Sequence, residues 1–164
     1  ESEKRLIKGT SKEPAMKDVK LNCHYPKKLE NLPAWMEIYG FDEYVYFDRH
    51  CLDEIESKPS LTKDEVKVIC DMLIIAVFYS KYIREEINRQ EFEKAGQRRI
   101  TKSCGTSSFS QYPDDYEASN GIKLHEHITY TLKHYNNPRI YLGWDKGSNK
   151  VIIGQLIEHK PTRR

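Results

Sequence analysis

GIKLHEHITYTLKHYNNP, residues 121–138, has a hydrophobic period that fits both a helix and a strand, and the fold class depends on which of the two forms. As a helix it has one apolar stripe, formed by Leu124, Ile128, Leu132 and Tyr135, and His127, Thr131 and His134 share another face. As a strand it has Leu124, Ile128, Tyr130 and Leu132 on one face and His125, His127, Thr129, Thr131 and Lys133 on the other. The β-branched and aromatic residues at 128–131, followed by a turn at Asn136-Asn137-Pro138, favour the strand.

Two more β-rich runs follow this segment. RIYLGWD (139–145) and KVIIGQLIEH (150–159) flank KGSN (146–149), which is a hairpin signal. We therefore predict a three-stranded antiparallel meander over residues 122–160. The segment 101–121 before it, rich in Ser, Gly, Asp and Asn, is predicted to be a loop.

The front of the chain is predicted to be helical. Thr62 and Glu65 form a capping-box pattern, and apolar residues from Val66 to Ile87 then recur at spacings near three and four, with no Gly or Pro before Gly96. An unbroken helix over 62–95 would be about 50 Å long, so we expect a kink or a fraying end. Its middle, CDMLIIAVF (70–78), is apolar on nearly every side, which predicts burial on more than one face.

Residues 29–58 are predicted to form two short helices broken near Gly40, with Trp35, Met36, Tyr39, Tyr44 and Leu52 as core anchors. The predicted fold class is α+β, with a helical part (21–100) and its long central helix packed on the small antiparallel meander. Residues 1–20 are predicted to be a flexible segment, and 21–164 a single domain.

Net charge, apolar runs and cysteine spacing limit the partners and the location that the sequence predicts. The 164 residues carry a formal charge of +2, so charge alone predicts neither a nucleic acid nor an anionic membrane as partner. No apolar run approaches the ~18 residues of a transmembrane helix, and we expect no membrane partner. The four cysteines form no CxxC pair, so we expect reduced, mostly buried thiols and a cytoplasmic location.

The predicted meander collects polar groups on the face away from the long helix. These groups are His125, His127 and Thr129 from the first strand, Arg139 and Tyr141 from the second, and Gln155 or His159 from the third. Metal-independent RNA cleavage needs a base for the 2′-hydroxyl, an acid for the leaving oxygen, and cations for the charged phosphorane. His125 and His127 are the candidate acid and base, and Thr129 and Tyr141 are candidate hydrogen-bonding aids.

Candidate phosphate-binding residues are Lys133 and Arg139 on or near the meander and Arg98, Arg99 and Lys102 in QRRITK. The last three have an alternative interpretation, because basic residues after a helix also favour the helix dipole. His125 and His127 likewise have a structural or merely solvent-exposed alternative. An HxH pair can bind zinc only with a third ligand, and we expect no metal and no cofactor. The sequence contains no P-loop, GxGxxG, GxSxG or HExxH motif.

Helices followed by a small antiparallel sheet resemble, in architecture only, the compact ribonuclease toxins of bacteria, and no residue roles are transferred from them. The resemblance and the histidines together predict an RNA-acting domain, specifically a metal-independent ribonuclease. The alternative function is a non-enzymatic interaction module, one domain of a larger protein, whose Tyr-rich surface binds a protein partner or inhibitor.

Overall fold

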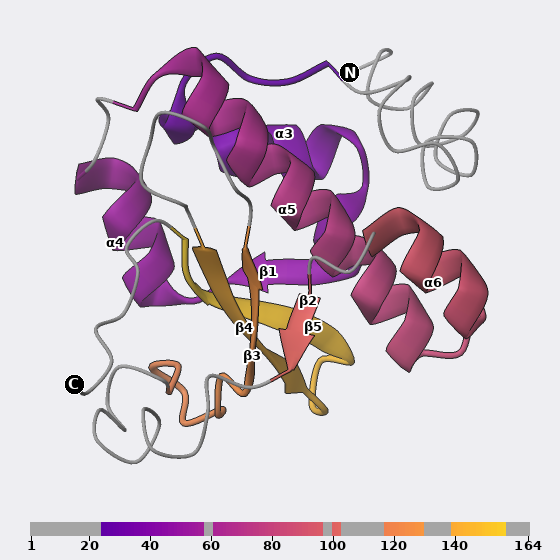
Figure 1. Ribbon diagram of the computed structural model, residues 1–164. Helices are drawn as coiled ribbons and strands as arrows, with labels where there is room; N and C mark the ends of the chain where they lie inside the picture. The colour runs from indigo at the N-terminus through magenta and orange to yellow at the C-terminus, as the bar shows by residue number, and fades with distance from the viewer. Residues whose placement is uncertain (1–23, 58–60, 97–99, 103–116, 130–138, 157–164) are drawn as a thin grey trace, which may run out of the picture.

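The computed structural model describes residues 24–57, 61–96, 100–102, 117–129 and 139–156 (Figure 1). Its helical elements precede most of its strands, as the α+β prediction required. They are η2 (Leu29–Asn31), α3 (Leu32–Ile38), η3 (Phe41–Glu43), α4 (Arg49–Ser57), α5 (Lys63–Ile83) and α6 (Arg89–Gly96). The strands are β1 (Val45–Phe47), β2 (Ile100–Lys102), β3 (Glu126–Thr129), β4 (Arg139–Asp145) and β5 (Lys150–Gln155).

The strands form one five-stranded sheet in the order β1-β5-β4-β3-β2. The predicted meander is present as the antiparallel pairs β3–β4 and β4–β5, and the β4–β5 turn falls at residues 146–149 as predicted. The sheet is larger than the predicted meander, because β2 adds to β3 and β1 joins β5 in parallel. The sheet is therefore mixed, and the helical front supplies one of its edges.

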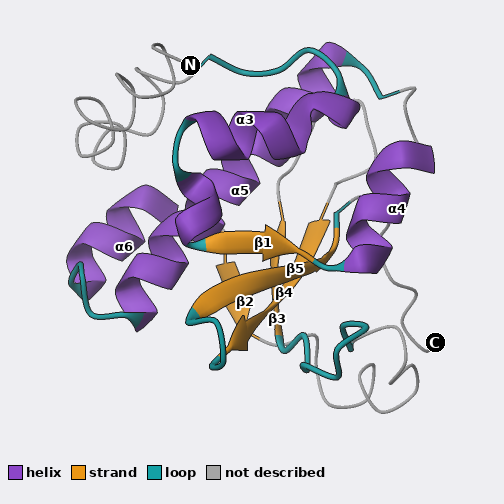
Figure 2. Cartoon of the chain, turned by 180° about the vertical axis from the view of Figure 1, so that it is seen from behind, coloured by secondary structure: helices purple, strands orange, loops and turns teal. Residues whose placement is uncertain are grey.

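Helix α5 is the centre of the hydrophobic core. It begins at the predicted capping box, in which the Glu65 backbone N–H donates to Thr62 Oγ1 and the Thr62 N–H donates to Glu65 Oε1. Nearly every residue from Val66 to Phe78 is buried, which confirms burial on more than one face. Figures 1 and 2 show α3 and α5 together on one side of the sheet, called here the inner side.

The predicted break in the long helix lies just after Ile83, where Glu85 adopts a left-handed backbone with φ 63°. Arg84 fixes this end. Its Nη2 donates to the Glu43 carbonyl at 2.6 Å, and its Nε donates to the Asn149 carbonyl at 2.8 Å in the β4–β5 turn. The guanidinium also lies 4.5 Å from the ring centroid of Tyr44, so one side chain joins α5, η3 and the hairpin.

The front of the chain differs from its prediction in two ways. The break near Gly40 is present, with φ 75° at that residue, but β1 lies where the second helix was expected to begin. Val45–Phe47 forms a strand because it pairs with β5, more than 100 residues away. Four of the five predicted core anchors are buried, but the fifth, Leu52 of α4, is 39% exposed.

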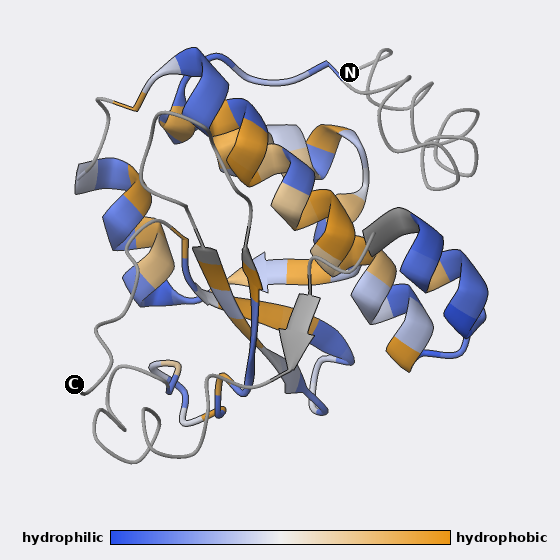
Figure 3. Cartoon of the chain, in the orientation of Figure 1, coloured by the Kyte–Doolittle hydropathy of each residue, from blue (hydrophilic) through white to orange (hydrophobic). Residues whose placement is uncertain are grey.

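Hydrophobic residues are concentrated in α5 and the central strands, while α6 shows a hydrophilic surface (Figure 3). The main core lies between the sheet and the helices. The sheet contributes to it through Val45, Ile128, Ile140, Leu142, Val151 and Ile153.

A second, smaller cluster lies on the outer face of the sheet, under a segment that we call the strap, residues 117–124 (Figures 1 and 2). It consists of Ala118, Leu124, Tyr141 and Ile152. Leu124 was predicted to share a face with Ile128, and this is wrong. Leu124 precedes β3 and packs on the outer face, whereas Ile128 belongs to the main core.

Two strand glycines allow the strap to lie against the sheet. A Cβ atom at Gly143 would stand 2.3 Å from the Lys123 carbonyl oxygen, and one at Gly154 would stand 2.2 Å from Leu124 Cδ1. Real Cβ atoms do not approach other atoms so closely, so any side chain at Gly143 must displace the strap backbone. The strap can therefore pack against the sheet only because Gly143 of β4 and Gly154 of β5 have no side chains.

We expect Gly143→Ala to lower the free energy of unfolding by about 1–3 kcal/mol, because the new methyl group overpacks against backbone. Gly147→Ala is the matched control: it lies in the β4–β5 turn, where the nearest atom to a new Cβ is Asp145 Oδ1 at 3.3 Å. This control should change stability by no more than about 0.5 kcal/mol. Urea denaturation measures both, and equal stabilities for the two variants would contradict the tight seat.

Candidate functional site

The register of β3 and β4 brings four predicted site residues to neighbouring positions. His127 stands opposite Tyr141, and two residues further along Thr129 stands opposite Arg139. Positions two residues apart on a strand share a face, so all four positions belong to the outer face. Tyr141 in turn stands opposite Gln155 on β5, which extends the row across three strands.

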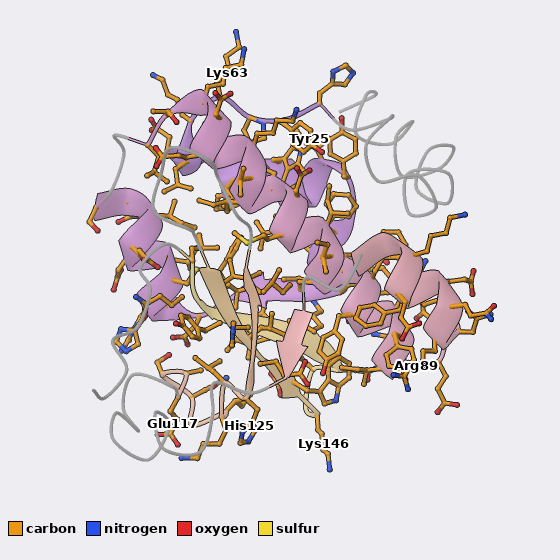
Figure 4. The ribbon with its side chains drawn as sticks, in the orientation of Figure 1. Tyr25, Lys63, Arg89, Glu117, His125 and Lys146 are labelled. Carbon is orange, nitrogen blue, oxygen red and sulfur yellow. The ribbon has the colours of Figure 1, made fainter. Side chains whose placement is uncertain are left out.

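The two histidines differ in exposure. His125 lies just before β3 and is exposed, at the same end of the molecule as Glu117 and away from the helical layer (Figure 4). His127 is only 7% exposed, and its ring centroid lies 5.8 Å from that of Tyr141, which is 1% exposed. We expected the polar side chains of the outer face to be exposed to solvent, but those of His127 and Tyr141 are buried.

The predicted phosphate ligands are placed only in part. Arg139 and Thr129 are located by the backbone of their strands, and Lys102 by its register opposite Glu126. Arg98, Arg99 and Lys133 lie outside the described residues, as does His159. The pairing of Ile100 with Ile128 and of Thr129 with Arg139 brings the ends of three strands to one end of the sheet.

Glu126 was not among the predicted site residues. It lies between the two histidines, and its carboxylate accepts a hydrogen bond from the Tyr79 hydroxyl of α5. Burial first, and then this hydrogen bond, raise the pKa of Tyr79 above its usual value of 10.0, which keeps the phenol protonated. The bond ties β3 to α5 on the inner side. The sequence signal for this contact was an acidic residue at a strand position that shares the apolar face of Ile128.

A polar clasp holds the strap to β1 and to the loop after it. The Ser119 N–H donates to Asp48 Oδ1 at 3.1 Å, and the Ser119 hydroxyl donates to the same oxygen. Asp48 is 4% exposed, and it also accepts from the N–H of His50 at the start of α4. Asn120 Nδ2 donates to the Tyr46 hydroxyl at 3.1 Å, which completes the clasp.

Asp145 connects Tyr46 to the β4–β5 turn. Its Oδ2 accepts from the Tyr46 hydroxyl at 2.6 Å and from the Ser148 hydroxyl at 2.9 Å, and its Oδ1 accepts from the Gly147 N–H at 2.9 Å. These hydrogen bonds, led by that of Tyr46, lower the pKa of the Asp145 carboxyl from 3.8. Burial and the bond to Asp145 raise the pKa of Tyr46 to about 12, so Tyr46 remains a donor at neutral pH.

Within the described residues, no group of three or more His, Cys, Asp or Glu side chains is placed to hold a metal ion. Cys51 and Cys70 are buried and form no disulfide, and burial raises the pKa of the Cys51 thiol. Cys23 and Cys104 lie outside the described residues.

Comparison with known proteins found no matching family model, no matching curated protein and no matching solved structure. In the part of the chain that the structure describes, no helix combines the length and the apolar character needed to cross a membrane.

Replacement of Asp145 should reveal a pH-dependent contribution to stability. Its pKa is lower in the folded chain than the unfolded value of 3.8, so the carboxylate stabilises the fold above about pH 4. This contribution disappears as the pH falls through the folded pKa. Asp145→Asn should lower the free energy of unfolding at pH 7 by about 1 kcal/mol, a figure reduced for solvent exposure.

Urea denaturation at pH 7 and pH 2.5 measures this effect, and the difference between wild type and Asp145→Asn should shrink at the lower pH. Asp53→Asn, at an exposed position on α4, serves as the control. A stability difference that is the same at both pH values would contradict the assigned role of the carboxylate.

Proposed function

We propose that this chain acts on RNA as a metal-independent ribonuclease, with the outer face of the sheet around β3 and β4 as its site. The register that pairs His127 with Tyr141 and Thr129 with Arg139 carries the proposal. It gathers an imidazole, a phenol, a hydroxyl-bearing residue and a cationic residue at four adjoining positions. These are the groups that acid–base cleavage of a phosphodiester uses.

In the proposed reaction one imidazole removes the proton of a ribose 2′-hydroxyl. The 2′-oxygen then forms a bond to the adjacent phosphorus, and the bond from phosphorus to the 5′-oxygen breaks. A second, protonated imidazole gives its proton to that 5′-oxygen. The products are a 2′,3′-cyclic phosphate and a free 5′-hydroxyl. His125 and His127 are the acid–base pair, and Thr129 and Tyr141 donate hydrogen bonds to the phosphate.

Cationic side chains stabilise the charged phosphorane in this proposal. Arg139 is adjacent by register, and chain connectivity supports the others. Arg98 and Arg99 directly precede β2, and Lys133 follows β3 by four residues. Since Ile100, Thr129 and Arg139 meet at one end of the sheet, short stretches of chain separate these cations from the site. Lys102 stands opposite Glu126, two residues from the inward-facing Ile128, so its position lies on the inner face and the proposal does not include it among the phosphate ligands.

A second candidate function is favoured by one observation. His127 and Tyr141 are almost fully buried, which is also how structural side chains behave in a closed core. In that case the chain is a non-enzymatic interaction module that binds a protein partner or inhibitor. The buried thiol of Cys51, which forms no disulfide, supports the further proposal of a reducing, cytoplasmic location.

The test is cleavage of total RNA in the presence of EDTA by wild type, His125→Ala and His127→Asn. We expect wild type to cleave, and each substitution to slow cleavage on the order of 10²-fold or more. His125 is exposed, so its truncation leaves the core intact, and the Asn at 127 keeps a polar side chain of similar shape.

His50→Ala is the matched control, because His50 is an exposed histidine on α4 whose described hydrogen bond uses only its backbone N–H. It should cleave as wild type does. Intact RNA with the wild-type chain, or equal cleavage by the His125→Ala and His50→Ala proteins, would refute the ribonuclease proposal and favour the interaction module.

A further inference from the structure

Tyr141 is buried from the outer side by the strap. Its cluster partners are Ala118 and Leu124 of the strap and Ile152 of β5, with Ile122 and Tyr46 packed at the margin. The His127 ring then packs against Tyr141 at 5.8 Å between centroids. The proposed site therefore lies beside and beneath residues 117–124, and an RNA strand reaches Tyr141 only when these residues move.

The strap is built as a separate small hairpin. Its described bonds between backbone groups are internal, from the Ala118 N–H to the Ile122 carbonyl at 2.8 Å and from the Gly121 N–H to the Ala118 carbonyl at 2.9 Å. An ion pair between Lys123 Nζ and Glu117 Oε2 at 2.6 Å closes its base. These contacts move with the strap, so it can leave the sheet without losing its own structure.

The described contacts between the strap and the rest of the chain lie on the outer face of the sheet, where its backbone also approaches Gly143 closely. Leu124 and Ala118 are its buried apolar contributions, and the clasp adds Ser119 on Asp48 and Asn120 on Tyr46. The main core lies on the other face of the sheet and shares no residue with the outer cluster. Release of the strap therefore exposes Tyr141 without opening the main core, as expected of a locally unfolding unit.

We propose that the strap is an autoinhibitory cover that opens as a unit and thereby controls access to Tyr141, against which the His127 ring packs. Its effect on RNA cleavage rests on the proposed function, whereas the opening itself does not. The closed form predominates, and the wild-type chain reacts during transient openings. A partner or substrate that binds the open form shifts the population toward it.

Ser119 offers a specific way to open the cover. Its hydroxyl donates to a carboxylate that is 4% exposed, so Ser119→Asp places a second carboxylate against Asp48. Two like charges at this separation repel strongly away from bulk water. Ser119→Ala combined with Asn120→Ala is the milder second variant, which removes two clasp bonds and adds no charge. Ser57→Asp, at the exposed end of α4, is the control for the added charge.

The measurement is hydroxyl-radical footprinting of the full chain, read by peptide mass spectrometry at Tyr141 and Phe41. Both side chains are 1% exposed, but Tyr141 lies under the strap and Phe41 lies in the main core. We expect Ser119→Asp to raise the oxidation rate of Tyr141 about tenfold and to leave that of Phe41 unchanged. The double variant should give a smaller rise, and Ser57→Asp none.

Tyr141 protected as in wild type in both strap variants would overturn the proposal, as would oxidation rates of Tyr141 and Phe41 that rise together. RNA cleavage separates this proposal from the ribonuclease proposal. If Tyr141 opens selectively and cleavage accelerates in step, both stand. If Tyr141 opens selectively and neither wild type nor Ser119→Asp cleaves RNA, the cover stands and the ribonuclease proposal fails.

Discussion

A sheet with apolar side chains on both faces must be covered on both faces, and this constraint governs the rest of the molecule. The inner face presents Ile128, Ile140 and Leu142 to the helical layer, where α5 is apolar enough to pack in several directions. The outer face presents Tyr141 and Ile152, and these require a second cover. The chain supplies one with a short hairpin, residues 117–124, that needs the bare backbones of Gly143 and Gly154 beneath it.

The second cover also determines the chemistry available at the candidate site. His125 directly follows the strap and is exposed to solvent. The rings of His127 and Tyr141, which pack on each other, are buried. The same clasp that holds the strap draws Asp48, Tyr46 and Asp145 into one hydrogen-bonded series along β1 and the β4–β5 turn. Stability and access are therefore coupled, because the contacts that complete the outer core are also those that restrict entry to it.

The local features of this fold were predictable from the sequence, and the non-local ones were not. The capping box at Thr62 and the hairpin turn at residues 146–149 use neighbouring residues, and both predictions are confirmed. Strand β1 was missed because its partner β5 is distant in the chain. The burial of His127 and Tyr141 was missed because the strap sequence has the composition of an ordinary turn. Glycines inside two β-rich runs, at 143 and 154, were the signal that another segment lies close against them.

We proposed that the polar row on β3 and β4 cleaves RNA through His125 and His127, and this mechanism leaves defined chemical groups at the ends of the cleaved fragments. Total RNA incubated with the wild-type chain in EDTA should yield fragments that end in 2′,3′-cyclic phosphates and begin with 5′-hydroxyls. Mass spectrometry of the fragment ends identifies these groups. Fragments with 5′-phosphates and 3′-hydroxyls would contradict cleavage by the ribose 2′-oxygen, and RNA that remains intact would contradict ribonuclease activity itself.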